Sequence, residues 1–216
     1  MPHVIAIDGP AASGKSSVAR ALAQRLGFLY VNSGDMYRAV TWHIIRRGID
    51  VADSEKIGDT AAAADITCAW RDGASHISID GIDPAAHLRD DEVNRAVSAV
   101  SSVPRVREIL VAKMRAYLSQ RDLVMEGRDI GSVVFPQTPF KFYIDAWPEV
   151  RAQRRHAQGQ RDEIAARDRA DSSRQTAPLK IASDAIVIDS STLSIDAVVQ
   201  EILAQLARQG LPAASR

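Results

Sequence analysis

The sequence predicts an α/β protein built on a doubly wound parallel sheet. Short apolar runs rich in β-branched residues alternate with longer segments of helical periodicity along most of the chain. The first apolar run leads into a glycine-rich loop that opens a helix. A length of 216 residues with 46% hydrophobic residues suits one domain with a substantial core. In such a fold, ligands bind at the carboxyl ends of the strands.

The glycine-rich loop, GPAASGKSS at residues 9–17, predicts a phosphate-binding site. It follows the expected strand HVIAIDG and fits the pattern G-x-x-x-x-G-K-[ST]. Such a loop points backbone N–H groups at anionic oxygens, and the next helix faces them with its positive end. Lys15 is expected to reach the β- and γ-phosphates of ATP, and the Ser16 hydroxyl to bind Mg²⁺. The predicted ATP-binding residues are Gly9, Pro10, Ala11, Ala12, Ser13, Gly14, Lys15, Ser16 and Ser17.

The alternation continues after this loop. SSVARALAQRLG has apolar residues at helical spacing and ends at Gly27, which suits a helix C-cap. FLYVNSG reads as a strand with a loop, and DMYRAVTWHIIRRG as a helix that stops at Gly48. Residues 65–83 then alternate apolar and polar side chains around two Asp-Gly turn signals. This alternation predicts a small antiparallel sheet inserted into the α/β pattern.

The second half of the chain returns to alternating strands and helices. Helices are expected at residues 90–102 and 103–121, with Pro104 marking the break between them. LVMEGRDIG runs from a strand into a loop, FKFYIDA and AIVIDSS are further strands, and SIDAVVQEILAQLARQ is a closing amphipathic helix. Residues 149–174 are helical, arginine-rich and poor in large apolar side chains. We interpret this segment and the inserted sheet as flaps around the site.

Composition excludes several classes of function. The 27 basic and 27 acidic residues balance, which argues against a nucleic-acid polymer or an anionic membrane surface as partner. Cys68 is the single cysteine, so neither an intramolecular disulfide nor a cysteine-based zinc site is available. The five histidines lack metal-ligand spacing, and no apolar run reaches the roughly 18 residues of a membrane span. We therefore expect a soluble cytoplasmic protein, and nothing in the sequence indicates more than a monomer.

Charged and hydroxyl side chains gather where the chain leaves the predicted strands. Three of them share one helix face, because Arg167, Asp171 and Arg174 stand at i, i+4 and i+7. The arginines exceed what one triphosphate needs, and the arginine fork suits a second anionic ligand. Surface ion pairing is the alternative for the last cluster. The full set is Ser33, Asp35, Arg38, Arg107, Glu126, Arg128, Asp129, Arg167, Asp171 and Arg174.

The chemistry of the second ligand leaves three functions open. A kinase that phosphorylates a hydroxyl usually needs a carboxylate to accept its proton, and Asp35 is the candidate base. A phosphate acceptor needs none, because its second pKa is about 6. A nucleotide-driven switch that hydrolyses ATP or GTP would need no acceptor at all. The chain has no N-K-x-D stretch to read guanine, which weakens the GTP version.

Seven stretches carry a resemblance to a known family: IDGPAASGKSS, NSGDMYRAVT, SSVPRVREIL, EGRDIGSVVFP, FYIDA, RDRADSSRQTAPLK and DAIVIDSSTLSID. Over nearly its whole length the chain resembles bacterial cytidylate kinases. The resemblance implies a single kinase domain over residues 1–216 with a P-loop NTPase-type, doubly wound parallel sheet. It also implies a small antiparallel nucleotide-binding insert at about residues 50–100 and an arginine-rich helical lid at about residues 149–174.

The resemblance further implies an activity and a site. The reaction is transfer of the γ-phosphoryl of MgATP to CMP, with dCMP expected as a second acceptor. Ser33, Arg38, Arg128 and Arg174 match contacts to the acceptor phosphate, and the three arginines with Lys15 are the expected catalytic residues. An aspartate can accept from the exocyclic amine of cytosine, a donor that uracil lacks. The positions that match cytosine contacts are Ser98, Arg107 and Asp129, and those that match ribose contacts are Arg167 and Asp171.

Three features depart from the family pattern. Asp35 stands where a small residue is common, and Glu126 where an aspartate is also common. Glu126 ends an apolar run, a place that suits either a Mg²⁺-bound water or a structural salt bridge. The lid segment is shorter than usual, which leaves ATP contacts by Arg154 and Arg155 open.

Overall fold

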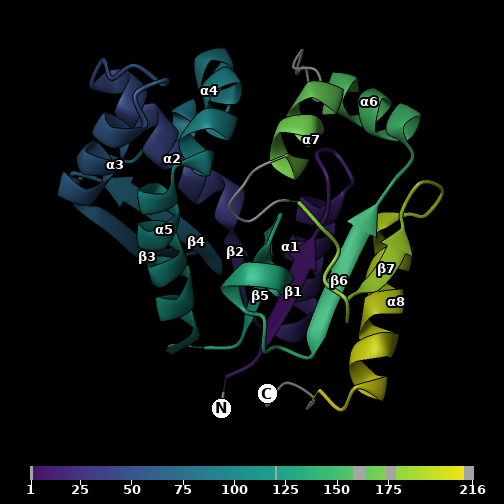
Figure 1. Ribbon diagram of the computed structural model, residues 1–216. Coiled ribbons are helices and arrows are strands. Elements are labelled where there is room, and N and C mark those ends of the chain that lie inside the picture. Colours follow the sequence, from purple (N-terminus) through teal and green to yellow (C-terminus); the bar gives the residue numbers. More distant parts are fainter. Residues whose placement is uncertain (1, 120, 158–163, 174–178, 212–216) are drawn as a thin grey trace.

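A computed structural model of the chain describes residues 2–119, 121–157, 164–173 and 179–211, with no side-chain description for residues 164–167. In this part of the chain, seven strands form one sheet in the order β3-β4-β2-β5-β1-β6-β7 (Figure 1). The strands are β1 (Val4–Asp8), β2 (Leu29–Asn32), β3 (Ile66–Arg71), β4 (Ala74–Ile79), β5 (Leu123–Gly127), β6 (Phe140–Asp145) and β7 (Ile186–Asp189).

The centre of the sheet is parallel, which confirms the predicted fold class. β2, β5, β1, β6 and β7 all run in the same direction. Their register brings the carboxyl ends together, because Asp8 lies opposite Gly127 on one side and Tyr143 on the other. Asn32 likewise lies opposite Glu126. The loops that follow these strands therefore start from one edge of the sheet.

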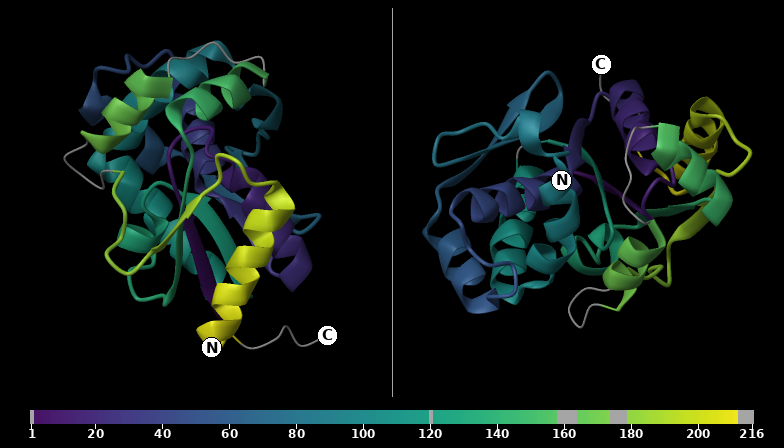
Figure 2. Two further views of the ribbon diagram at one scale, coloured as in Figure 1. Left: turned by 90° about the vertical axis from the view of Figure 1, so that its right-hand side faces the viewer. Right: turned by 90° about the horizontal axis from the view of Figure 1, so that it is seen from above.

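Helices cover both faces of the sheet. Side chains alternate along β1, so that Val4 and Ala6 join one core cluster while Ile5 and Ile7 join another. The right-hand view of Figure 2 shows α1 and α8 on one side of the sheet and α5 on the other. The helices are α1 (Lys15–Leu26), α2 (Ser33–Arg46), α3 (Ser54–Ala63), α4 (Asp91–Ser102), α5 (Pro104–Ala116), α6 (Pro148–Ala157), α7 (Ile164–Ser172) and α8 (Ile195–Arg208).

Most predicted helix boundaries agree with the structure. Gly27 ends α1 in the left-handed conformation, and Pro104 opens α5 with only Val103 between it and the end of α4. Two boundaries differ. Helix α5 ends at Ala116 and not at residue 121 as expected, and α2 begins earlier than expected. The start of α2 lies at Ser33 and not beyond the NSG loop, because the Asn32 side chain accepts a hydrogen bond from the Asp35 N–H.

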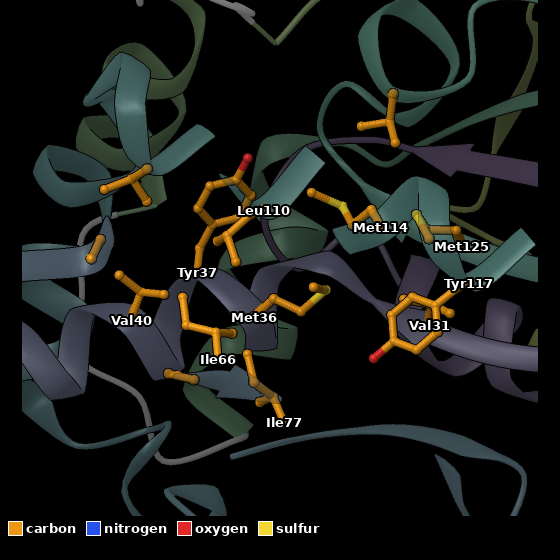
Figure 3. Packing of buried hydrophobic residues seen from close by; sticks show 14 of the residues in the cluster. Val31, Met36, Tyr37, Val40, Ile66, Ile77, Leu110, Met114, Tyr117 and Met125 are labelled. Carbon is orange, nitrogen blue, oxygen red and sulfur yellow. The ribbon is translucent and has the colours of Figure 1, made fainter. Parts of the chain in front are cut away.

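The antiparallel insert is present, but it extends the central sheet and does not form a sheet of its own. β3 and β4 pair along their whole length, and the turn between them has positive φ at Asp72 and Gly73. β4 joins β2 through the single pair of Tyr30 and Ala74. The hairpin also shares the larger core cluster, shown in Figure 3, which includes Val31, Met36, Tyr37, Val40, Ile66, Ile77, Leu110, Met114, Tyr117 and Met125.

Helix α3 was not expected from the sequence pattern. Its side chains are short or polar, and its buried positions are Ile57, Gly58 and Ala61. The Asp53 side chain caps it by accepting from the Lys56 N–H. Ile57 anchors the helix in the larger core cluster. Among the described residues, no helix has the length and apolar character needed to cross a membrane.

The anchoring of α3 can be tested at Ile57, which is completely buried. Replacing it by alanine should lower the free energy of unfolding by about 2–5 kcal/mol, because the change removes apolar contacts and leaves a cavity. The matched control is Ile181→Ala, since Ile181 is 49% exposed and its loss should cost at most about 0.5 kcal/mol. Denaturant unfolding of both variants makes the comparison. Equal losses would show that α3 is not held by Ile57.

Candidate active site

The sheet's carboxyl edge opens into a cavity of about 670 Å³. In Figure 1, α2 and α4 stand on one side of this edge and α6 and α7 on the other. Of the predicted site residues, those that line the cavity are Ala11, Ala12, Gly14, Lys15, Ser16, Ser17, Ser33, Arg38, Ser98, Arg107, Arg128, Asp129 and Asp171. Gly9, Pro10 and Ser13 belong to the same loop but do not line it. Arg174 and the side chain of Arg167 lie outside the described part of the chain.

The loop at residues 9–17 has the backbone that a phosphate cradle requires. Gly9 has φ +153°, and a Cβ there would lie 2.1 Å from the carbonyl oxygen of Ile144 on β6, so only glycine fits. Lys15 is the first residue of α1, as the motif predicts. Its Nζ donates to the Pro10 carbonyl at 3.0 Å, which curves the side chain back over the loop. The loop and the helix N-terminus thus form one unit.

Glu126, at the end of β5, lies beside the phosphate loop. Its carboxylate accepts a hydrogen bond from Ser16 Oγ at 2.7 Å and another from the Tyr30 hydroxyl. The glutamate is 1% exposed, and within the described residues its hydrogen-bond partners are hydroxyls and not a basic group. The salt-bridge interpretation therefore finds no partner there. Burial and the adjacent carboxylate raise the pKa of Tyr30 above its usual range, so this tyrosine stays a neutral donor.

A second buried carboxylate, Asp8, ends β1 directly before the phosphate loop. It accepts hydrogen bonds from the backbone N–H groups of Ile130 and Gly131, both at 2.8 Å. Burial raises the pKa of Asp8 to about 6, although the two N–H groups oppose this shift. Asp8 ties the turn after β5 to the end of β1. Sequence reasoning missed this residue, although its place between a buried strand and a glycine loop is a usable signal.

Arg107 and Asp129 line the cavity and form a buried ion pair. Arg107 Nη2 donates to Asp129 Oδ2, and Nη1 donates to the Ser101 carbonyl at 3.2 Å. The guanidinium also lies over the Tyr37 ring, 5.4 Å from its centre. Asp129 therefore pairs with a residue from α5 and not with its chain neighbour Arg128. Two residues predicted from the resemblance to contact cytosine thus lie side by side.

Arg128 links the phosphate loop to α7. Its Nε donates to Asp171 Oδ2 and its Nη1 to the Gly9 carbonyl, both at 2.9 Å. Ser98 on α4 adds a 3.5 Å hydrogen bond to the other oxygen of Asp171. Asp171 is only 2% exposed, so the interpretation as a surface ion pair is wrong for this residue.

The start of α2 contributes Ser33, Asp35 and Arg38. Ser33 Oγ donates to the Glu126 carbonyl at 2.8 Å, which fastens α2 to β5. Arg38 is buried and donates to the Leu88 carbonyl. Asp35 forms an ion pair of 2.5 Å with Arg89. The candidate base of the hydroxyl-acceptor hypothesis is thus engaged by a cation.

The family model described as cytidylate kinase matches residues 5–208. The chain belongs to the cytidylate kinase family. The cytidylate kinase of Rhodococcus opacus is 43% identical over 212 residues, which cover 93% of each chain. Membership makes the protein a nucleoside monophosphate kinase, a phosphotransferase, and it confirms the resemblance seen in the sequence motifs.

Solved structures support the fold of this cytidylate kinase family member. A gluconokinase from Sinorhizobium meliloti has a TM-score of 0.50 and 17% identity, with 96% of this chain and 93% of that chain covered. A shikimate kinase from Acinetobacter baumannii has a TM-score of 0.50 and 14% identity, with 98% and 97% covered. At these identities the likeness establishes the shared kinase fold alone.

Helices α6 and α7 of this cytidylate kinase family member contact the phosphate loop directly. Arg151 on α6 donates to Asp168 on α7 and to the Ala11 carbonyl, while the Ala11 N–H donates to Asp168. Arg154 donates to the Ser13 carbonyl at 3.3 Å and to both oxygens of Ser190. Arg155 lines the cavity. Sequence reasoning missed Arg151 and Asp168, since nothing in spacing separates them from solvent-facing charges on the same helices.

The shifted titration of Asp8 can be measured. Its carboxyl should titrate near pH 6 in carbon-detected NMR, well above its ordinary 3.8. The folded protein binds this proton more tightly than the unfolded chain. The stabilisation is therefore complete below about pH 4 and is lost as the pH rises through about 6. Asp8→Asn should remove this fall in the free energy of unfolding.

The matched control is Asp184, whose pKa is lowered by the hydrogen bond from Lys141. Asp184→Asn should remove a pH dependence of the opposite sign, in which stability is lost as the pH falls. A midpoint for Asp8 near 4 would contradict the expected shift.

Proposed function

We propose that the protein transfers the γ-phosphoryl group of MgATP to CMP, giving CDP and ADP, with dCMP as a second acceptor. One observation supports this above all others. The phosphate loop with Lys15 lines the same cavity as three arginines from other segments of the chain, Arg38, Arg107 and Arg128. A cavity with two separate anion-binding regions suits a triphosphate donor and a phosphate-bearing acceptor. Membership of the cytidylate kinase family supports a cytidine nucleotide as the acceptor.

The donor side offers a fit for Mg²⁺. Ser16 Oγ and the buried carboxylate of Glu126 lie together beside the phosphate loop, and hard oxygen ligands of this kind suit Mg²⁺. Within the described ranges, no group of three or more His, Cys, Asp or Glu side chains could hold a metal ion by itself. This agrees with an ion that takes most of its ligands from water and phosphate oxygens. When bound, the ion would neutralise charge on the β- and γ-phosphates.

On the acceptor side, the proposed contacts are those that the family resemblance implies, and the chemistry of the residues present suits them. Arg38 and Arg128 would bind the phosphate of CMP, together with Arg174. Asp129 would accept from the exocyclic amine of cytosine, with Arg107 beside it. Arg128 would exchange its bond to Asp171 for one to the acceptor phosphate, since a phosphate monoester carries a charge of about −1.5 to −2 at pH 7 and a carboxylate only −1.

The ribose and the remaining cytosine contacts complete the proposed acceptor site. Released from Arg128, Asp171 would accept from the ribose hydroxyls, and Arg167 shares its helix. Ser98 lies within hydrogen-bond distance of Asp171 on the same side of the cavity, where it would contact cytosine. The acceptor would thus bind between α4, α5 and α7.

Catalysis in this proposal is positioning and charge stabilisation. Lys15 and the arginines neutralise the transferring group, and approach of the lid excludes the water that would hydrolyse ATP. No general base is required, because the acceptor phosphate is already ionised. The ion pair between Asp35 and Arg89 agrees with this, since it engages the carboxylate that a hydroxyl acceptor would need.

Lys15→Ala should lower CMP-dependent ADP release about 100-fold or more, because a phosphate-neutralising charge is lost. Lys56→Ala is the matched control, since Lys56 is an exposed lysine on α3 that does not line the cavity. A coupled ADP-release assay compares CMP, UMP, a hydroxyl acceptor and no acceptor. Turnover without any acceptor would indicate a hydrolysing switch, and selective use of the hydroxyl acceptor would indicate the other class of kinase.

Asp129→Ala should reduce kcat/KM for CMP by at least about tenfold and shrink the CMP-to-UMP preference, since a base-edge pairing discriminates by about 1–3 kcal/mol. The KM for ATP should stay constant, because the phosphate loop is a separate part of the site. Steady-state kinetics with both acceptors decides the point. If CMP and UMP weaken equally, Asp129 acts only by bracing Arg107.

A further inference from the structure

We propose that Asn94, together with the ion pair between Asp35 and Arg89, positions the guanidinium of Arg38 for the acceptor's phosphate. The proposal rests on the proposed function and extends it to residues outside the predicted site. Its basis is a chain of hydrogen bonds that joins α2, the segment at residues 88–90 and α4 around Arg38.

Asn94 is the inner member of this network. It lies on α4 and is buried. Its Oδ1 accepts from Arg38 Nη1 at 2.7 Å, and its Nδ2 donates to the Arg89 carbonyl at 2.8 Å. The side chain must therefore accept with one atom and donate with the other, which an amide does and a carboxylate does not. Asn94 fixes Arg38 to the backbone of the neighbouring segment.

The backbone of residues 88–90 is the second part of the network that holds Arg38. The Leu88 carbonyl accepts from Arg38 Nη1 at 2.8 Å and from Arg89 Nη1 at 3.3 Å. Arg89 in turn is held by Asp35, which lies three residues before Arg38 and hence on the same face of α2. The segment is thus fastened to α2 at two points, by the ion pair outside and by Arg38 inside.

This arrangement has a consequence for affinity. A free arginine side chain loses rotamer freedom when it binds a ligand, and that loss weakens binding. Arg38 is already held by Leu88 and by Asn94 on α4, so much of this loss occurs during folding. Removing the partners should weaken the acceptor and leave the donor unaffected, because none of these partners belongs to the phosphate loop.

The experiment measures CMP and ATP separately. Asn94→Ala should raise the KM for CMP and the calorimetric Kd of CMP about tenfold, as expected for lost hydrogen bonds to a charged group. Asp35→Ala should raise both about threefold, because its ion pair is partly exposed. The KM for ATP should stay constant in both variants.

The matched control is Asp59→Ala. It breaks the exposed ion pair between Asp59 on α3 and Arg105 on α5, which does not line the cavity. This variant should leave both KM values unchanged. A charge exchange provides the rescue: Asp35→Arg alone should weaken CMP, and combining it with Arg89→Asp should restore most of the affinity.

The outcomes distinguish a failure of the proposed function from a failure of the positioning proposal. If wild-type protein neither binds nor phosphorylates CMP, the proposed function fails. If wild type uses CMP while Asn94→Ala changes thermal stability alone, Asn94 is structural and the positioning proposal is overturned. An equal rise in the KM for ATP would also overturn it. Should Asn94→Ala fail to fold, the CMP affinities of Asp35→Ala and of the charge exchange decide the matter.

Discussion

The site depends on a buried carboxylate at the end of the central strand. Asp8 accepts two backbone N–H groups from the turn after β5, and these two hydrogen bonds join the phosphate loop to the segment that carries Arg128 and Asp129. Burial makes the charged form costly, as the raised pKa shows, but buried N–H groups without an acceptor would also be costly. The phosphate loop and the segment with Arg128 and Asp129 are therefore fixed relative to each other at the edge of the sheet. Flexible surface loops would not hold them to the same degree.

The buried arginines of the site each have partners within the protein. Buried cations repel one another and are costly without partners. Arg107 pairs with Asp129, Arg128 with Asp171, and Arg38 with uncharged oxygens of Asn94 and Leu88. The differences among these partners matter for binding. An arginine held by a carboxylate must exchange that partner for the ligand, whereas a hydrogen bond to an amide or carbonyl oxygen places no net negative charge beside the guanidinium.

The sequence predicts the fold well because its signals are local. The phosphate loop, the parallel sheet, the end of α1 at Gly27 and the break at Pro104 each follow from residues adjacent in the chain. Helix α3 is missed because its apolar face is short, and its stability comes from Ile57 packing into a distant core. Spacing identifies the charged positions of the site but not their partners. The pair of Arg107 and Asp129 spans 22 residues, and only the fold brings the two together.

The surroundings of Glu126 and Asp35 indicate different roles for these two acidic residues, whose roles the sequence leaves open. Glu126 is almost fully buried, and its partners are the hydroxyls of Ser16 and Tyr30. Among the described residues, no salt bridge involves this carboxylate, and it lies beside the place where the donor's phosphates and their cation are proposed to bind. Asp35 is partly exposed and forms an ion pair with Arg89. Its charge therefore helps to hold the segment at residues 88–90. Glu126 near the end of β5 and Asp35 in the first turn of α2 both line the cavity, but the partner of each decides whether its charge acts on a ligand or on the protein.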